Sequence, residues 1–296
     1  MGEGVKFRDN SWLDKSSKYS PLFIESSVED LKIIYDQQIW YRFSVDGFCV
    51  DMFCYFRKNA ENLIICGQDA IQRDIVKLPY FYRWSWHAEV ASSYITINDP
   101  TLYMSDSLNG GWHQGYSSAW ALDVVNRILD RIRELLQIPS EKVMLYGISA
   151  GGFWALMSAV CFPGCSVVTE IPQVDLFLYE DDGPKEKMLA RCYRGRSIKY
   201  IKNKYSSRMR VIDRWLESRS LPRRVWIYHN LKDPKNTRTQ IEPFWDEVQR
   251  LKGDGFLSEI DEIHFMFFNR MTAKGGHIPM EKDQTLAVWK MVLSGM

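Results

Sequence analysis

The 296-residue sequence lacks an excess of either charge, since 38 Lys and Arg residues stand against 37 Asp and Glu residues, for a formal net charge of +1. A chain that is basic throughout, as many nucleic-acid-binding proteins are, is therefore excluded. Histidine is scarce, at five residues, and the six cysteines include no C-x-x-C pair. We therefore expect neither a metal site nor a disulfide framework, and the cysteines are predicted to be buried, reduced thiols.

Long apolar runs are missing as well. None reaches the ~20 residues that a helix needs to cross a bilayer, and the polar segment 1–20 lacks the apolar stretch of a signal peptide. Lys6 stands where the myristoylation pattern after Gly2 requires Ser or Thr. These absences predict a protein of the reducing cytoplasm with no transmembrane segment.

Aromatic residues are abundant, and one segment is rich in positive charge. Aromatic residues make up 14% of the chain, while the apolar (46%) and charged (25%) fractions are those of an ordinary globular protein. The segment 184–224 carries 14 Lys and Arg residues against three acidic residues, a local net charge of +11, so the rest of the chain is acidic. This segment is either a helical insert with a solvated basic face or a patch that attracts an anionic substrate or the phosphates of a carrier.

The spacing of apolar residues predicts alternating strands and helices. Strands are predicted at 39–45, 48–56, 63–66, 94–97, 143–146, 167–169, 225–229 and 263–268. Helices are predicted at 118–137, from residue 150 onward, at 240–251 and at 282–293. This order predicts an α/β fold with a mostly parallel central sheet of about eight strands and helices on both faces, opened by an antiparallel hairpin.

The most specific motif is Gly147-Ile-Ser149-Ala-Gly151, which fits G-x-S-x-G directly after the apolar strand 143–146 and directly before a helix. That context is typical of a nucleophile elbow, in which glycines make room for a sharp strand-to-helix turn. Ser149 is therefore the predicted nucleophile.

A serine nucleophile needs a base, and only five histidines exist. His277 lies in a Gly-rich loop after the last strand, where it can lean over the sheet edge toward the serine, and it is the predicted base. His264 lies within a predicted strand and His229 ends one, so both are expected to be structural. His113, in another Gly-rich loop, is the reserve candidate for substrate contact.

The base in turn needs an orienting carboxylate. Asp233 lies four residues beyond the strand 225–229, on a turn bounded by Pro234, and fits this third role. Asp246 is the alternative, although it falls inside a predicted helix and is expected to face solvent.

With Ser149, Asp233 and His277 in this order, the sequence resembles the α/β-hydrolases from about residue 38 to its end. The resemblance implies a single α/β-hydrolase domain over 1–296, with residues 174–222 as a basic helical lid inserted in it. It also implies an oxyanion hole made by the backbone N–H groups of Ala150 and Gln68. Here Cys66-Gly-Gln-Asp69 stands in place of the His-Gly pair that is common in esterases.

A second segment, 98–115, resembles segments in α/β-hydrolase-like proteins encoded beside bacterial surface-polysaccharide genes. It carries Tyr103, Trp112 and His113 among Gly and polar residues, a composition that suits sugar rings, so these three are predicted to bind substrate. A second aromatic cluster, at 80–86, stands in the place of the family's first helix. The alternative for both clusters is that the aromatic rings pack loops onto the sheet.

These features predict a serine esterase that deacylates an O-acylated glycan through an acyl-enzyme, without a cofactor. The basic insert favours an anionic glycan over a lipid. One alternative is an O-acetyltransferase for a surface polysaccharide that uses the same triad, with acetyl-CoA as donor. Another is a non-catalytic hydrolase-fold component of a glycan assembly system. No nucleic-acid partner is expected, since no recognised motif accompanies the basic segment.

Overall fold

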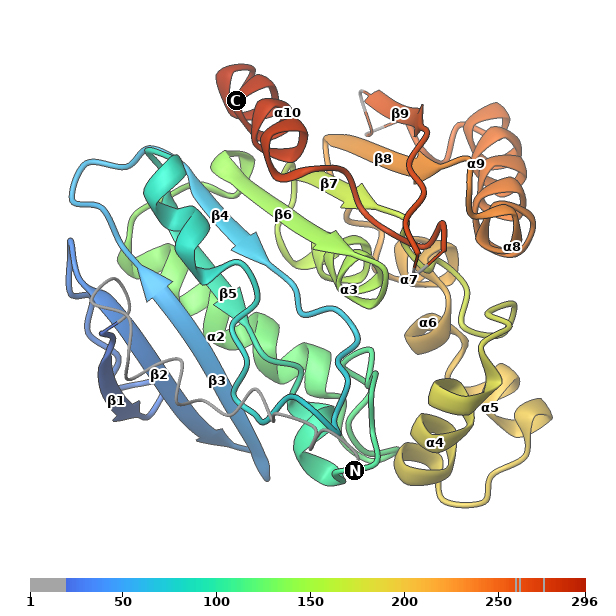
Figure 1. Ribbon diagram of the computed structural model, residues 1–296, viewed down its shortest axis with the longest axis horizontal. Coiled ribbons are helices and arrows are strands. Elements are labelled where there is room, and N and C mark those ends of the chain that lie inside the picture. Colours follow the sequence, from blue (N-terminus) through green and yellow to red (C-terminus); the bar gives the residue numbers. More distant parts are fainter. Residues whose placement is uncertain (1–19, 259, 261, 274) are drawn as a thin grey trace, which may run out of the picture.

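The computed structural model describes residues 20–258, 260, 262–273 and 275–296, so the predictions made for segment 1–19 lie outside the described residues. Within them, nine strands form one sheet in the order β1-β2-β3-β5-β4-β6-β7-β8-β9 (Figure 1). The strands are β1 (Leu22–Ser26), β2 (Gln38–Val45), β3 (Phe48–Tyr55), β4 (Leu63–Cys66), β5 (Ser93–Ile97), β6 (Val143–Ile148), β7 (Ser166–Glu170), β8 (Arg224–Asn230) and β9 (Glu262–Phe268).

The sheet is mostly parallel, as predicted. Strands β5, β4, β6, β7, β8 and β9 pair in parallel, whereas β3 is antiparallel to both of its neighbours, β2 and β5. Strand β1 was not predicted and lies parallel to β2 at the edge of the sheet, with Leu22 opposite Ile39. It escaped prediction because it is short, and its three apolar residues, Leu22, Phe23 and Ile24, form no alternating pattern.

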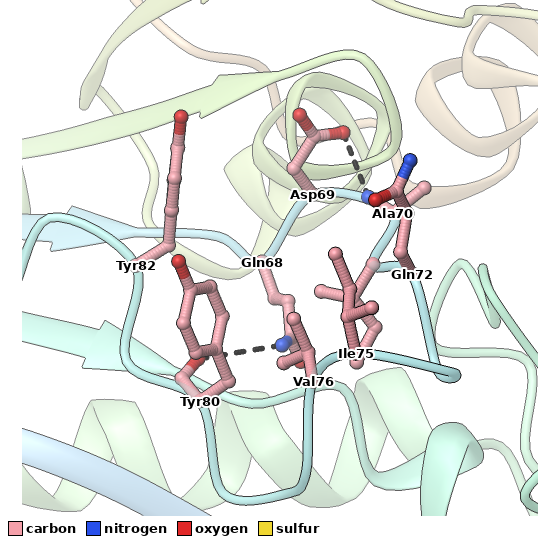
Figure 2. Close-up of a pocket in the computed structure, with 9 residues that line it drawn as sticks. Gln68, Asp69, Ala70, Gln72, Ile75, Val76, Tyr80 and Tyr82 are labelled. Carbon is pink, nitrogen blue, oxygen red and sulfur yellow. Dashed lines mark hydrogen bonds between the residues drawn. The ribbon is translucent and has the colours of Figure 1, made fainter. Parts of the chain in front are cut away.

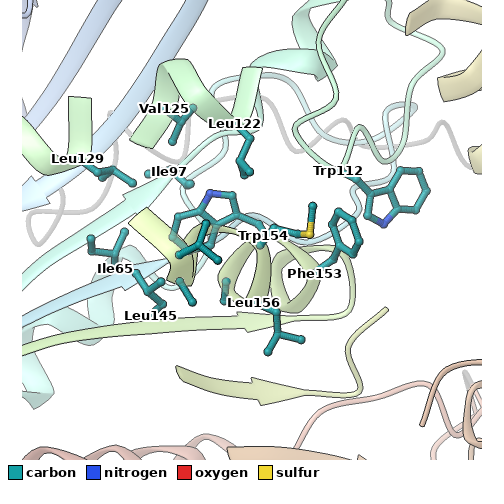
Figure 3. Close-up of a cluster of buried hydrophobic side chains, with 14 of the residues drawn as sticks. Ile65, Ile97, Trp112, Leu122, Val125, Leu129, Leu145, Phe153, Trp154 and Leu156 are labelled. Atoms are coloured by element: carbon teal, nitrogen blue, oxygen red, sulfur yellow. The ribbon is translucent and has the colours of Figure 1, made fainter. Parts of the chain in front are cut away.

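Helices cover both faces of the sheet (Figure 1). Alternate residues of β6 point to opposite faces, so Leu145 joins one apolar cluster and Tyr146 the other. The first cluster surrounds Trp154 of α3 (Ala150–Ser158) and takes in α2 (Ala121–Leu135), as Figure 3 shows. The second is centred on Trp289 of α10 (Lys282–Ser294).

The segment between β7 and β8 is helical, as predicted. It comprises α4 (Asp182–Tyr193), α5 (Ile198–Lys204), α6 (Ser206–Met209) and α7 (Val211–Ser218). Tyr193, Met209 and Trp215 of this insert belong to the same apolar cluster as α2 and α3. Among the described residues, no helix combines the length and the apolar character that crossing a membrane requires.

Part of the positive charge of the insert is neutralised by the acidic body. The guanidinium of Arg210 lies 2.7 Å from Asp175 and from Asp213, and 2.5 Å from Glu247 on α9 (Glu242–Gly253). Arg214 reaches Asp123 on α2 at 3.5 Å. The insert is thus attached to the body by charge as well as by apolar contacts.

Phe81, Trp84 and Trp86 of the aromatic cluster at 80–86 pack onto the sheet, in agreement with the structural alternative, whereas Tyr80 and Tyr82 line a cavity that is described below. Phe81 is buried against Phe53 of β3, and the guanidinium of Arg83 lies 4.7 Å from the ring centroid of Trp86. The segment that connects β4 to β5 contains a short 3₁₀ helix at Trp84–Glu89. These rings therefore occupy the space that a longer helix would fill.

We expect Arg210→Ala to lower the free energy of unfolding by about 1–3 kcal/mol, because it leaves three carboxylates facing one another; the value allows for the 27% exposure of the arginine side chain. Urea denaturation followed by circular dichroism measures this change. Arg131→Ala is the control, since the exposed side chain of Arg131 contacts Glu134 at 3.5 Å, and the change should cost less than about 0.5 kcal/mol. Equal losses in both variants would contradict the anchoring role of Arg210.

Candidate active site

Ser149 occupies a sharp turn between β6 and α3. Its φ of 50° and ψ of −115° lie outside the regions that L residues normally adopt, and its N–H donates to the carbonyl of Glu170 on β7 at 3.0 Å. A Cβ on Gly147 would lie 2.0 Å from the carbonyl oxygen of Gly151, and a Cβ on Gly151 would lie 2.8 Å from that of Gly67. Both glycines of the motif are therefore required by close backbone contact.

Three residues that are far apart in sequence form one hydrogen-bonded chain. His277 Nε2 lies 2.8 Å from Ser149 Oγ, and His277 Nδ1 lies 2.6 Å from Asp233 Oδ2. Asp233 comes from the loop after β8, and His277 from the loop after β9. A hydroxyl, an imidazole and a carboxylate in this sequence can move a proton away from the hydroxyl.

Asn236 fixes the carboxylate of this chain. Its Nδ2 donates to Asp233 Oδ2 at 2.7 Å, and its backbone N–H donates to Oδ1 at 3.3 Å. Burial would raise the pKa of Asp233, but the hydrogen bonds from His277 and Asn236 outweigh it and hold this pKa below its usual value. Because an ionised carboxylate can only accept, the proton of His277 belongs on Nδ1, and Nε2 is left to accept from Ser149.

The region of the predicted oxyanion hole holds an unexpected acid. The carboxyl of Asp69 accepts the N–H of Ala70 at 2.7 Å, and the backbone N–H of Ala150 lies near enough to lower its pKa. Desolvation raises the pKa of Asp69, while the charge of His277 and these two N–H groups oppose the shift. The Gln68 side chain is fixed beside it, since its Oε1 accepts the N–H of Asp99 at 2.6 Å. Sequence reasoning missed Asp69, although it directly follows Gln68.

A cavity of about 250 Å³ opens next to this acid (Figure 2). Asp69 and Gln72 stand on one side of it, and Tyr80 and Tyr82 stand on the other. Ile71, Ile75 and Val76 add apolar wall. The cavity thus offers two aromatic rings, amide groups and a carboxylate within reach of the elbow.

The three residues predicted to bind substrate lie elsewhere. Trp112 and His113 are 2% and 1% exposed, and Figure 3 shows Trp112 at the border of the apolar cluster, beside Phe153. The hydroxyl of Tyr103 donates to Asp51 on β3, and β5 and β4 separate that strand from β6. None of the three lines the cavity beside Asp69, so the structure gives no support to sugar contacts by these side chains.

Gln173, which follows β7, was not predicted. Its side chain is wholly buried, its Nε2 lies 2.8 Å from Ser149 Oγ, and its backbone N–H donates to the Ser149 carbonyl at 3.3 Å. The only signal in the sequence is its position just beyond the carboxyl end of a predicted strand beside the elbow. Tyr179 was missed as well: its ring meets that of Trp112 edge to face, with centroids 5.7 Å apart.

Tyr179 brings the beginning of the insert to the site. Burial, followed by the negative charges of Asp181, Asp69 and Asp233, raises the pKa of its hydroxyl above the usual value. The Tyr179 hydroxyl therefore lies within electrostatic reach of both Asp69 and Asp233.

The other histidines and the alternative acid have separate surroundings. His229 Nε2 lies 2.8 Å from Thr237 Oγ1, and burial lowers the pKa of this histidine. His264 stacks on Trp226, and Asp246 is exposed on α9. Of the acids considered from the sequence, Asp233 is thus the one that contacts His277.

The loop that carries His277 depends on Gly276. A Cβ there would lie 1.8 Å from the carbonyl oxygen of Lys232, next to Asp233. We expect Gly276→Ala to lower the free energy of unfolding in urea by about 1–3 kcal/mol, because the loop must move away from Lys232. The same movement should separate His277 from Asp233.

Gly253→Ala is the matched control for Gly276→Ala. A Cβ at Gly253, in α9, meets no heavy atom within 4 Å in the part of the chain that the structure describes. Alanine is the better helix former, so this variant should be stabilised by about 0.4–1 kcal/mol. A Gly276→Ala protein as stable as the wild type would contradict the contact with Lys232.

No family model matches the chain, and no curated protein matches it. Solved structures, in contrast, are similar to this chain. A mutant of the capsule O-acetyltransferase of Neisseria meningitidis serogroup A in complex with CoA has a TM-score of 0.59 and 16% identity, covering 86% of this chain and 94% of that one. Acetyl xylan esterase 1 from Thermoanaerobacterium sp. has a TM-score of 0.56 and 14% identity, covering 96% and 91%.

A third similar structure is a glycosylation-associated protein complex, Gap123, from Streptococcus agalactiae, with a TM-score of 0.53 and 13% identity, covering 85% of this chain and 44% of that one. At these identities the comparisons show the fold. Together with the mostly parallel sheet and the turn at Ser149, they establish that this chain has the α/β-hydrolase fold.

Proposed function

We propose that this protein is a serine-dependent acyl-transfer enzyme that acts on the O-acyl groups of a glycan. The observation that carries the proposal is the hydrogen-bonded chain from Ser149 Oγ through His277 to Asp233 at the turn between β6 and α3. Ser149 is the nucleophile, His277 the base, and Asp233 the group that orients the imidazole.

In the first half-reaction, His277 Nε2 takes the proton of Ser149 Oγ while Oγ forms a bond to the acyl carbon. The carbonyl π electrons move onto the carbonyl oxygen, and they return as the bond to the leaving group breaks. The leaving alcohol or thiol takes the proton from His277. In the second, water or a sugar hydroxyl gives its proton to His277 and attacks the acyl-enzyme, and Oγ leaves with that proton.

The carbonyl oxygen carries negative charge in both tetrahedral intermediates. In this proposal it accepts the backbone N–H groups of Ala150 and Gln68, and losing one such donor typically costs ~10²–10³ in rate. The Ala150 N–H lies close enough to the carboxyl of Asp69 to lower its pKa. A charged Asp69 carboxyl beside this N–H would repel an anionic oxygen, so in this proposal the carboxyl moves away or loses its charge before attack.

The adjoining cavity is the proposed glycan site. Its two tyrosine rings and its amide groups suit the apolar faces and the hydroxyls of a sugar. Residues 174–222 act as a lid in this proposal, and the ring of Tyr179 connects the lid to Trp112, in the loop after β5. A further role of the basic insert is to attract an anionic glycan or the phosphates of acetyl-CoA.

Hydrolysis and transfer differ only in what attacks the acyl-enzyme: water makes an esterase, and a sugar hydroxyl makes an O-acetyltransferase. The likeness to a capsule O-acetyltransferase with CoA favours transfer, and the likeness to an acetyl xylan esterase favours hydrolysis. Incubation with acetyl-CoA and candidate polysaccharides separates them. Acetylated glycan identifies a transferase, whereas acetate release alone identifies an esterase.

Ser149→Ala is expected to reduce hydrolysis of a small aryl acetate to the background rate, since no other nucleophile sits at the elbow. Asp233→Asn should lower kcat about 10⁴-fold, because an amide in place of the carboxylate favours the wrong tautomer of His277. Asp246→Asn, on the exposed face of α9, is the control and should leave the rate unchanged. Turnover unaffected by Ser149→Ala would refute the mechanism, whereas absence of turnover in the wild type would favour a non-catalytic role in glycan assembly.

Asp69→Ala should raise kcat/KM for the aryl acetate about tenfold, because the Ala150 N–H then faces the carbonyl oxygen without a competing carboxylate. Initial rates at saturating and subsaturating ester measure this effect. Asp74→Ala removes an exposed acid from the same loop and is the matched control. A rate lowered by Asp69→Ala alone would show that this carboxyl assists turnover instead of obstructing it.

A further inference from the structure

Gln173 touches the nucleophile more closely than its place in the sequence suggests. Its Nε2 lies 2.8 Å from Ser149 Oγ, the distance that also separates Oγ from His277 Nε2. Its Oε1 accepts the indole N–H of Trp112 at 3.3 Å. The amide is therefore held at both ends, between the loop that carries Trp112 and the elbow.

The indole of Trp112 determines which end of the amide faces the serine. An indole nitrogen can donate a hydrogen bond but cannot accept one, so the amide oxygen must point to Trp112 and the amide nitrogen to Ser149. Ser149 Oγ thus accepts a hydrogen bond from Gln173. Its own proton is then directed to His277 Nε2, the remaining partner at hydrogen-bond distance.

The geometry points to Gln173 as a catalytic residue, a fixed donor to Ser149 Oγ that stabilises this oxygen whenever it carries negative charge. The inference rests on the proposed role of Ser149 as nucleophile. A hydrogen bond to an ionised oxygen is about twice as strong as one to a neutral oxygen, so this donor favours the charged states of Oγ over the resting hydroxyl.

Oγ becomes electron-rich at two moments. When its proton moves to His277, the electron pair of the O–H bond stays on Oγ until the bond to the acyl carbon forms. When the second tetrahedral intermediate collapses, the C–Oγ bond breaks, its electron pair returns to Oγ, and Oγ recovers a proton from His277. The Gln173 N–H faces Oγ in both, so it assists attack and departure alike.

A purely structural role of the Gln173 side chain predicts a different effect of substitution on the reactivity of Ser149. The backbone N–H of Gln173 already donates to the Ser149 carbonyl, so the loop after β7 is tied to the elbow without the side chain. If the amide only filled space, a side chain of similar shape should preserve the reactivity of Ser149. Gln173→Met keeps most of the volume and removes both the donor and the acceptor.

The test is the second-order rate at which a fluorophosphonate labels Ser149 in the folded protein, checked by circular dichroism and by mass spectrometry of the labelled peptide. Gln173→Met should react about 10- to 100-fold more slowly than the wild type. Asn126→Leu is the matched control, because it removes a buried amide at the opposite end of α3, where Asn126 contacts Cys161, and it should react at the wild-type rate.

Trp112→Phe tests the orientation while leaving Gln173 in place. Without the indole N–H, the amide can turn and present its oxygen to Ser149, so labelling should slow about three- to tenfold. The double variant should be no slower than Gln173→Met alone, since both changes act on the same hydrogen bond. Additive effects of the two changes would overturn the inference.

Gln173→Glu adds a second measurement, the pH dependence of the labelling rate, which a change in packing alone would not affect. An ionised carboxylate cannot donate to Oγ, whereas a protonated carboxyl can, so the deficit relative to the wild type should shrink as the pH falls. Dividing by the wild-type rate at each pH removes the pH dependence that the two proteins share. A deficit that is constant with pH would overturn the inference, and so would equal rates for Gln173→Met and the wild type.

The inference and the proposed function fail in different ways. A wild-type protein that is not labelled at Ser149 would overturn the proposed function and the inference with it. A labelled wild type whose rate is matched by Gln173→Met would overturn the inference alone and leave the function standing.

Discussion

The candidate site depends on one close backbone contact, between the two glycines that flank Ser149. A side chain on Gly147 would collide with the Gly151 carbonyl, at 2.0 Å, so only glycine lets β6 turn directly into α3. This turn holds Ser149 at a positive φ and presents its hydroxyl at the carboxyl edge of the sheet. Because the strands around β6 are parallel, β4, β7, β8 and β9 all end at that edge, and the loops that follow them begin there.

Contacts with neighbouring residues fix the positions of these loops. Gly276 presses the histidine loop against Lys232, and Asn236 fixes the carboxylate of Asp233. Gln173 is fixed through Trp112, in the segment that follows β5. The serine is consequently surrounded by side chains whose positions are set by contacts between loops, which is the preorganisation that electrostatic stabilisation of a reacting oxygen requires.

Local patterns predicted most of this arrangement. Eight strands, the elbow and the contact of Asp233 with His277 follow from short motifs, because a strand, a turn and a helix each leave a signal within a few residues. Gln173 and Asp69 belong to no recognisable motif, since their importance comes from an approach to Ser149 and Ala150 that only the folded chain creates. Trp112 was predicted to bind substrate, but whether a tryptophan faces a ligand or the core depends on what packs over it.

In the insert between β7 and β8, residues 174–176 lie against residues 209–211. Val211 N–H donates to Val174, Leu176 N–H donates to Met209, and the guanidinium of Arg210 joins Asp175 to Glu247. Residues 174–176 and 209–211 are therefore paired, so α4, α5 and α6 form a loop that is closed at one point, and α7 continues from it to β8. Because Tyr193 of α4 and Ile201 of α5 belong to the apolar cluster of the body, moving either helix away from the body would expose apolar surface to water.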